Sequence, residues 1–152
     1  MKRMIAFFIL VVSLLFTNYS SKNNFKTFKE AESVLIVTSQ KVEGVDLLVE
    51  NGEEFYYLFE GEKTQKIFEK LDLFEGMKGV NLYFSGDLTL SYFQKKLDYI
   101  TDKSQVEGSD VYYGYFKGYT GYKLIEGKKI NTQLAKVEDG WVLGFPIILT
   151  GF

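Results

Sequence analysis

The sequence predicts an α+β fold in which two or three helices cover one face of an antiparallel sheet. Apolar residues recur at helical spacing in several segments of the first two thirds of the chain, and four strand-like runs follow residue 108. Sequences typical of tight turns separate several of these segments. Helices segregated from antiparallel strands are characteristic of this fold class. The length of 152 residues corresponds to roughly one domain.

The first segment after the polar residues near position 22 predicts a helix over residues 25–40. Its spacing places several apolar side chains on one helix face, at steps of three and four residues: Phe25, Phe28, Ala31 and Leu35. Three β-branched residues, Val34, Ile36 and Val37, crowd its second half and leave a strand open there. We favour the helix for the whole segment.

A hairpin, a helix and a strand are predicted next. Strand-like residues 45–50 and 55–59 flank Asn51-Gly52, which is a strong signal for a two-residue hairpin turn. Residues 62–73 place apolar side chains at helical spacing with charged residues between them, and therefore predict an amphipathic helix. Residues 80–86 alternate between apolar and polar side chains, which indicates a strand.

The most regular helix pattern spans residues 90–101. Its apolar residues follow one another at steps of three, four and three: Leu90, Phe93, Leu97 and Ile100. Because this spacing gathers them on one face, we expect that face to pack on the sheet formed by the strands that follow.

The C-terminal third predicts four successive strands, at residues 111–117, 119–125, 130–137 and 141–149. Turns are expected at Glu126-Gly127 and at Asp139-Gly140. Gly144 precedes Phe145-Pro146, and this order favours a bulge or the close approach of another backbone segment.

The composition excludes several kinds of chemistry. The chain has no Cys and no His, and its only Arg is Arg3. Without these residues it forms no disulfide, thiolate nucleophile, histidine triad, imidazole base or zinc site with Cys or His ligands. No segment has the spacing of a calcium loop. We therefore expect no metal, no cofactor and no catalytic residue of these types.

The N-terminus predicts an export signal. Lys2 and Arg3 precede an apolar run at residues 4–16, and polar residues follow it. The run of 13 residues is shorter than the roughly 20 that span a bilayer. Residues 1–21 are expected to be a signal peptide or an uncleaved N-terminal anchor, and both alternatives stay open. Residues 22–152 then form a single α+β domain outside the cytoplasmic membrane, with membrane contact only through the N-terminal segment.

The charge of the predicted domain argues against nucleic-acid binding. Without Lys2 and Arg3, 16 basic and 20 acidic residues remain, which gives a formal charge of −4. Phosphate contacts need clustered cations, so an acidic exported domain without arginine is a poor nucleic-acid binder.

The C-terminal half resembles a known family. Asn131-Thr132-Gln133-Leu134-Ala135 is followed by a Val-x-Gly-x-Pro-Ile pattern at residues 142–150, and residues 84–88 and 94–97 agree with it in order. These motifs resemble the YwmB family, which comprises exported proteins of Gram-positive endospore-forming bacteria and their relatives. The resemblance covers about residues 75–152, while the N-terminal part is shorter than usual and Phe152 replaces the usual Tyr. It implies an α+β fold with a TATA-box-binding-protein-like component, which describes architecture and no DNA binding.

The candidate binding residues are mainly tyrosines. A dense aromatic run occupies residues 112–122, and alternation along a strand sends successive side chains to opposite faces. One set then packs in the core, whereas an exposed set would suit a peptide, glycan or protein surface. Asn131 and Gln133 share one strand face, where they either satisfy backbone groups or contact a ligand. The candidates are Tyr112, Tyr113, Tyr115, Tyr119, Tyr122, Asn131 and Gln133.

These observations favour a non-enzymatic domain of the cell envelope that binds or scaffolds an envelope protein or glycan. The alternative is a hydrolase of envelope polymer that works without histidine. It would use a pair of carboxylates from Asp87, Glu107 and Asp110, or the Ser91–Lys95 pair, whose spacing of four places both on one helix face. A purely structural exported domain is the third hypothesis.

Overall fold

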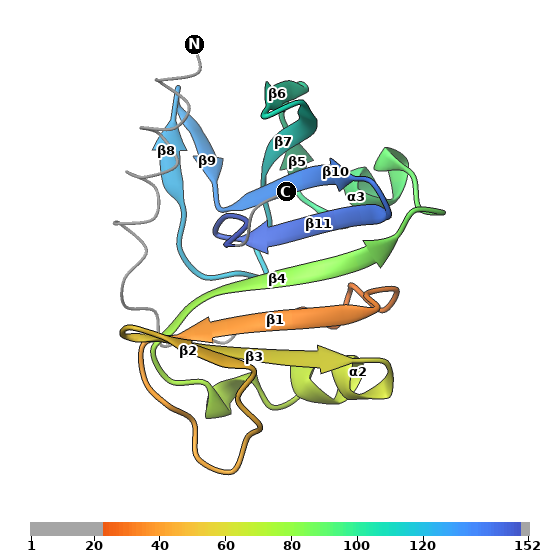
Figure 1. The fold of residues 1–152 in the computed structure, drawn as a ribbon. Coiled ribbons are helices and arrows are strands. Elements are labelled where there is room, and N and C mark those ends of the chain that lie inside the picture. The colour runs from red at the N-terminus through yellow and green to blue at the C-terminus, as the bar shows by residue number, and fades with distance from the viewer. Residues whose placement is uncertain (1–22, 150–152) are drawn as a thin grey trace.

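The computed structural model describes residues 23–149 (Figure 1). The predicted signal or anchor at residues 1–21 lies outside the described residues. The first half contains β1 (Ser33–Thr38), β2 (Val49–Asn51), β3 (Glu54–Glu60), α2 (Glu62–Phe68), the 3-10 helix η1 (Leu71–Leu73) and β4 (Met77–Ser85). The second half contains α3 (Leu90–Lys96), β5 (Tyr99–Ile100), β6 (Ser104–Val106), β7 (Ser109–Tyr115), β8 (Lys123–Ile125), β9 (Lys128–Ile130), β10 (Thr132–Val137) and β11 (Gly140–Phe145).

One large antiparallel sheet dominates the fold. Its strands follow the order β2-β3-β1-β4-β11-β10-β7-β5, and β6 pairs with β7 beside this path. All of its pairings are antiparallel, and β8 and β9 form a separate two-stranded ribbon. The α+β class with a large antiparallel sheet is therefore confirmed.

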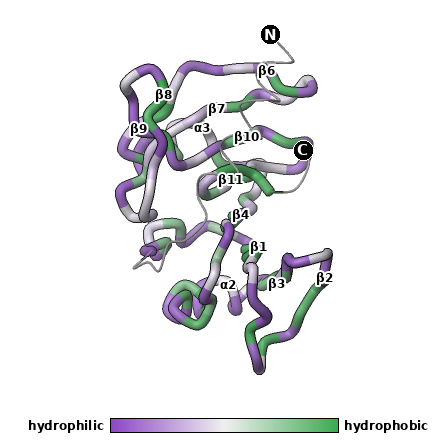
Figure 2. The backbone as a smooth tube through the Cα atoms, turned by 90° about the vertical axis from the view of Figure 1, so that its left-hand side faces the viewer, coloured by the Kyte–Doolittle hydropathy of each residue, from purple (hydrophilic) through white to green (hydrophobic). Residues whose placement is uncertain are grey.

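The two described helices cover the same face of this sheet. Phe68 of α2 and Phe93 of α3 belong to one buried cluster, together with Leu82 of β4 and Leu143 of β11. Figure 2 shows α2 to the left of β1 and β3, and α3 to the left of β10. Because a sheet needs one apolar layer to bury its inner face, this layer is the main core of the molecule.

The helix predicted at residues 90–101 is confirmed over its first two turns. Phe93 is fully buried against Trp141, with ring centroids 5.2 Å apart, and Leu97 is also buried in the main core. The helix ends earlier than predicted because Leu97 adopts extended backbone angles. The Asp98 N–H then donates to the Tyr115 carbonyl, which starts β5 beside β7.

The helix predicted over residues 25–40 is wrong. Residues 25–31 form tight turns that bury Phe25, Phe28 and Ala31, and Ser33–Thr38 is strand β1. β1 pairs with β3 on one side and β4 on the other, and its last five residues are buried. A strand covered on both faces has a continuous apolar sequence, so the crowded β-branched residues were the better signal here.

Several boundaries also differ from the prediction. The helix expected at residues 62–73 is divided into α2 and η1, and the strand expected at residues 45–50 begins only at Val49. The strand expected at residues 119–125 is reduced to β8, because residues 116–121 form a loop. The C-terminal strand ends at Phe145 rather than at residue 149.

The three expected hairpins are present, and two of their turns are shifted by one residue. Glu126-Gly127 joins β8 to β9 as predicted, with positive φ angles of 50° and 78°. The β2–β3 hairpin turns at residues 52–53 rather than at Asn51-Gly52, because Asn51 already pairs with Glu54 in the ladder. The third hairpin turns at residues 138–139 instead of Asp139-Gly140, because Gly140 already pairs with Val137 in the ladder.

Candidate binding surface

The second face of the sheet is covered at its centre by the chain's own C-terminal segment. After β11 the backbone turns back, so that the Ile148 N–H donates to the Gln133 side-chain oxygen at 3.0 Å. The Leu149 N–H donates to the side-chain oxygen of Asn81. A side chain at Gly144 would collide with the backbone of Ile147, which confirms the predicted close approach. Gln133 is only 2% exposed, so its hydrogen bond to Ile148 is shielded from water and fixes this segment on the sheet.

Asn131 satisfies backbone groups and is not on the surface. It is 1% exposed, and its side-chain oxygen accepts from the Phe116 N–H at 2.8 Å. Its side-chain nitrogen faces the carbonyls of Phe116, Tyr119 and Gly121 at 2.9–3.1 Å. Of the two alternatives open from the sequence, the structure shows the backbone role. Asn131 thereby fixes the loop that leads from β7 to β8.

Three of the candidate tyrosines pack inside the molecule. Tyr119 is buried in the main core, where its ring lies 5.5 Å from that of Phe145. Tyr112 is half-buried beside Trp141. Tyr113 is half-buried in a smaller cluster on the second face, and this burial raises its pKa. The prediction of an exposed binding residue is therefore wrong for Tyr119. Tyr112 and Tyr113 are half-buried and mainly pack against the two hydrophobic clusters.

The remaining two candidates, Tyr115 and Tyr122, meet on the surface with two residues that the sequence did not single out. The Tyr115 ring stacks on Tyr99 at 6.1 Å and meets Tyr122 edge-on at 6.2 Å. The Lys129 Nζ lies 4.5 Å from the centre of the Tyr122 ring and 5.8 Å from that of Tyr115. With Leu124, we call this group the Tyr–Lys surface: Tyr99, Tyr115, Tyr122, Leu124 and Lys129.

The β8–β9 ribbon presents the outer half of this surface. Leu124 pairs with Lys129 in the ribbon register, so both side chains point to the same side. Tyr122 is two residues before Leu124 and is 46% exposed, whereas Leu124 is 62% exposed. Tyr99 was missed because it was assigned to a helix. Lys129 would have followed from the ribbon register set by Glu126-Gly127.

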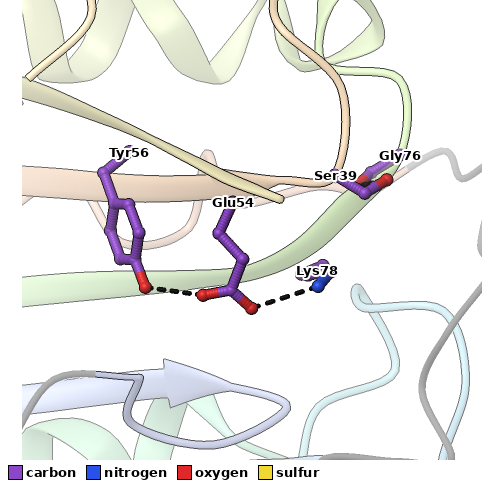
Figure 3. A network of polar contacts seen from close by, with 5 residues as sticks. All are labelled: Ser39, Glu54, Tyr56, Gly76 and Lys78. Atoms are coloured by element: carbon purple, nitrogen blue, oxygen red, sulfur yellow. Dashed lines mark hydrogen bonds and ion pairs between the residues drawn. The ribbon is translucent and has the colours of Figure 1, made fainter. Parts of the chain in front are cut away.

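A polar network separate from the Tyr–Lys surface joins β3 to β4 (Figure 3). The Tyr56 hydroxyl donates to Glu54 at 2.7 Å, and Lys78 donates to the other oxygen of Glu54 at 3.1 Å. The hydrogen bond to ionised Glu54 raises the pKa of Tyr56 to about 12 and lowers that of Glu54. A tyrosine so reluctant to ionise is a poor base at neutral pH, and the network instead links β3 to β4 across β1.

Ser39 and Gly76, also drawn in Figure 3, connect the segment after β1 to the segment before β4. The Ser39 backbone N–H and its hydroxyl both donate to the Gly76 carbonyl, at 2.9 and 3.2 Å. Gly76 has a positive φ of 68°, and a side chain there would lie 2.5 Å from the Ser39 hydroxyl. This contact joins the end of β1 to the start of β4.

The residues considered for hydrolysis are spread over the surface. Ser91 and Lys95 are exposed on α3, and Asp87 and Glu107 are exposed in turns. Asp110 pairs with Lys103 at 3.5 Å and accepts from Gln105. Two open hollows of about 320 and 350 Å³ meet at Asp72, and none of these residues lines them.

The acidic residues and the helices of residues 23–149 bear on metal binding and on membrane crossing. In that range no group of three or more carboxylates is arranged to hold a metal ion. No helix among the same residues combines the length and apolar character needed to cross a bilayer.

Comparisons with family models, with curated proteins and with solved structures find no match to this chain. The YwmB resemblance of residues 75–152 therefore stays a prediction. The fold and the Tyr–Lys surface together define an α+β domain in which the β8–β9 ribbon places an exposed cation and apolar side chains beside the tyrosines of β5 and β7.

Proposed function

We propose that this chain is a non-enzymatic binding or scaffolding domain of a bacterial cell envelope. Residues 1–21 would export it, and the Tyr–Lys surface would contact an envelope protein or glycan. The proposal includes membership of the YwmB family and a TATA-box-binding-protein-like component, which the antiparallel sheet with helices on one face supports.

The exposed ring of Tyr122 is the observation that carries this proposal. Tyrosine offers a large apolar ring with a polar tip, which suits recognition at a wet surface. Tyr122 is held from below by Tyr115 and by the Asn131 contact to the Gly121 carbonyl, so little ordering is needed on binding. A side chain that is both fixed and exposed is a suitable anchor for a partner.

The spread of the hydrolytic candidates supports binding over catalysis. A glycosidase needs two carboxyl groups that face each other across a substrate, and a Ser–Lys dyad needs a hydrogen bond between its members. Ser91 and Lys95 are both open to solvent on α3, and Asp110 is already engaged by Lys103.

The test is envelope association in a Gram-positive host that expresses the full chain. We expect the protein outside the cytoplasm, retained by envelope material from which the membrane has been extracted, so that an uncleaved N-terminal anchor does not account for the retention. The double substitution Tyr122→Ser with Leu124→Ser should reduce retention at least about tenfold, because it removes both exposed apolar groups. The denaturation midpoint should change little, since both side chains lie at the surface.

Leu73→Ser is the matched control, because Leu73 is 56% exposed on η1, away from the ribbon. It should leave retention unchanged. Protein recovered only from the cytoplasm would contradict the export signal. Equal retention of the wild type and the double variant would show that the Tyr–Lys surface is not the binding site.

A further inference from the structure

The Tyr–Lys surface combines an apolar ring with a cation at a fixed spacing. Lys129 lies between the rings of Tyr115 and Tyr122 and opposite Leu124. An ammonium group held near two aromatic faces is attracted by their quadrupoles, and this attraction holds the flexible lysine in place. A ligand that meets this surface therefore encounters apolar and cationic groups together.

The ribbon that carries this surface is positively charged in an acidic chain. Residues 123–130 contain three lysines and one glutamate, whereas the whole chain has a formal charge of −2. Lys128 and Lys129 take part in no ion pair within residues 23–149. Their charges are thus available to an anion within the Debye length of about 10 Å at 0.1 M salt.

The rings favour a partner with flat apolar faces between its charges. The C–H face of a sugar ring packs on an aromatic side chain. The hydroxyl groups of the sugar can then form hydrogen bonds with a tyrosine hydroxyl and with water. A small inorganic anion would use Lys129 alone and leave Tyr122 and Leu124 exposed. A neutral glycan would use the rings and leave Lys128 and Lys129 without a counterion.

Resting on the proposed function, we infer that the Tyr–Lys surface binds an anionic glycan, with a sugar ring on Tyr122 and an acidic group at Lys129. Single-stranded nucleic acid also combines rings with anions. A glycan is favoured over nucleic acid, because the proposed export would bring the domain to envelope glycans. The acidic charge and the single cationic ribbon also differ from the extended basic grooves of nucleic-acid binders.

The test is a calorimetric titration of the exported protein with each of four defined polymers. Polygalacturonate supplies sugars with a carboxylate on each ring, and dextran supplies neutral sugars. Polyphosphate supplies charge without sugars, and oligothymidylate supplies bases with phosphates. We expect polygalacturonate to bind more tightly than the other three, with an affinity that falls as salt rises.

Two variants separate the contributions of ring and charge. Tyr122→Ala and Lys129→Gln should each weaken polygalacturonate binding at least about tenfold. Lys63→Gln, which removes an exposed lysine of α2, should not weaken it. Lys129→Gln keeps the inference falsifiable even if Tyr122→Ala fails to fold, because Lys129 is exposed.

Each alternative result overturns the inference in a distinct way. Equal binding of dextran would remove the charge requirement, and equal binding of polyphosphate would remove the sugar requirement. Tighter binding of oligothymidylate would identify a nucleic-acid surface. If no glycan binds while envelope retention still depends on Tyr122 and Leu124, the inference fails and the proposed function stands. If that retention is also absent, both fail.

Discussion

At the scale of single residues, buried amide side chains hold loops and termini in place through hydrogen bonds to the backbone. Asn131 joins β10 to the loop after β7, and Gln133 and Asn81 hold the C-terminal segment on the sheet. Each amide satisfies backbone groups that would otherwise be buried without partners, which costs about 1–3 kcal/mol per group. Asn131 suits this role because its amide both accepts, from the Phe116 N–H, and donates to backbone carbonyls.

The Glu54–Tyr56–Lys78 network gives a prediction for alkaline pH. The folded-state pKa of Tyr56 is raised from 10.0 to about 12, so the stability that protonated Tyr56 contributes is complete below pH 10. That contribution is lost as the pH rises through about 12. In an absorbance titration, the difference between the wild type and Tyr56→Phe should show one tyrosine that ionises near pH 12.

Two variants check the cause of this shift. Glu54→Gln should move the Tyr56 ionisation down toward its ordinary value, because the hydrogen bond to Glu54 is its largest cause. Tyr92, whose pKa is also raised through burial and its bond to Glu30, should be unaffected by Glu54→Gln. A Tyr56 component that ionises near pH 10 in the wild type would contradict the network.

At the scale of elements, α3 and its continuation anchor the helix layer. Leu97 is buried next to the sheet, and the Leu97 N–H donates to the Phe93 carbonyl at the end of α3. Leu97→Ala should lower the free energy of unfolding by about 2–5 kcal/mol through lost transfer energy and a cavity. Denaturant unfolding measures this change.

Gln94→Ala is the control on the same helix, since Gln94 is exposed. It should change the free energy of unfolding by less than about 0.5 kcal/mol. A Leu97→Ala effect as small as that of the control would mean that this side chain is not part of the core.

The first predicted helix shows the limit of periodicity at this scale. Phe25, Phe28 and Ala31 recur every three residues, but two consecutive tight turns bury the same positions as a helix face would. Val34 and Ile36 point to the main core, and Leu35 and Val37 are buried on the other face of β1. Spacing alone does not separate these cases, because coverage of both faces depends on distant strands.

At the scale of the whole molecule, the return of the C-terminal segment covers the sheet face that the helices leave open. Gly79 and Gly144 make space for it, since a side chain at Gly79 would lie 2.6 Å from Leu149. Ile147 and Ile148 are buried as a result. The segment thus completes the second hydrophobic layer around Val111 and Val142.

Gly144→Ala should disrupt this arrangement. The added methyl group would overlap the Ile147 backbone, so we expect a loss of about 1–3 kcal/mol from overpacking. Hydrogen exchange at the amides of Ile148 and Leu149 should accelerate, because their bonds to Gln133 and Asn81 would be strained. Denaturant unfolding and amide exchange measure the two effects.

Gly86→Ala is the matched control, since its added methyl group would meet nothing closer than 3.4 Å and its φ is not positive. It should change neither the unfolding midpoint nor the exchange of residues 148–149. Unchanged exchange in Gly144→Ala would contradict the close packing of the C-terminal segment on the sheet.

The sequence by itself determined the fold class, the face of α3, the turn at Glu126-Gly127 and, to within one residue, the turn between β2 and β3. These features depend on neighbouring residues, because helix faces and two-residue turns are set by local spacing and by allowed φ angles. The absence of Cys and His likewise excluded whole classes of chemistry without any structure.

Only the tertiary structure decided the candidate site. Of the seven candidate residues, Tyr115 and Tyr122 come together on the surface. Asn131 and Gln133 are buried and form hydrogen bonds to backbone groups. Tyr99 and Lys129 joined the surface through the pairing of β5 with β7 and of β8 with β9. The physical reason is that exposure depends on strand register and on which distant segment covers a face. Gly144 before Phe145-Pro146 indicated a close approach of backbone, but not that the approaching segment would cover Gln133.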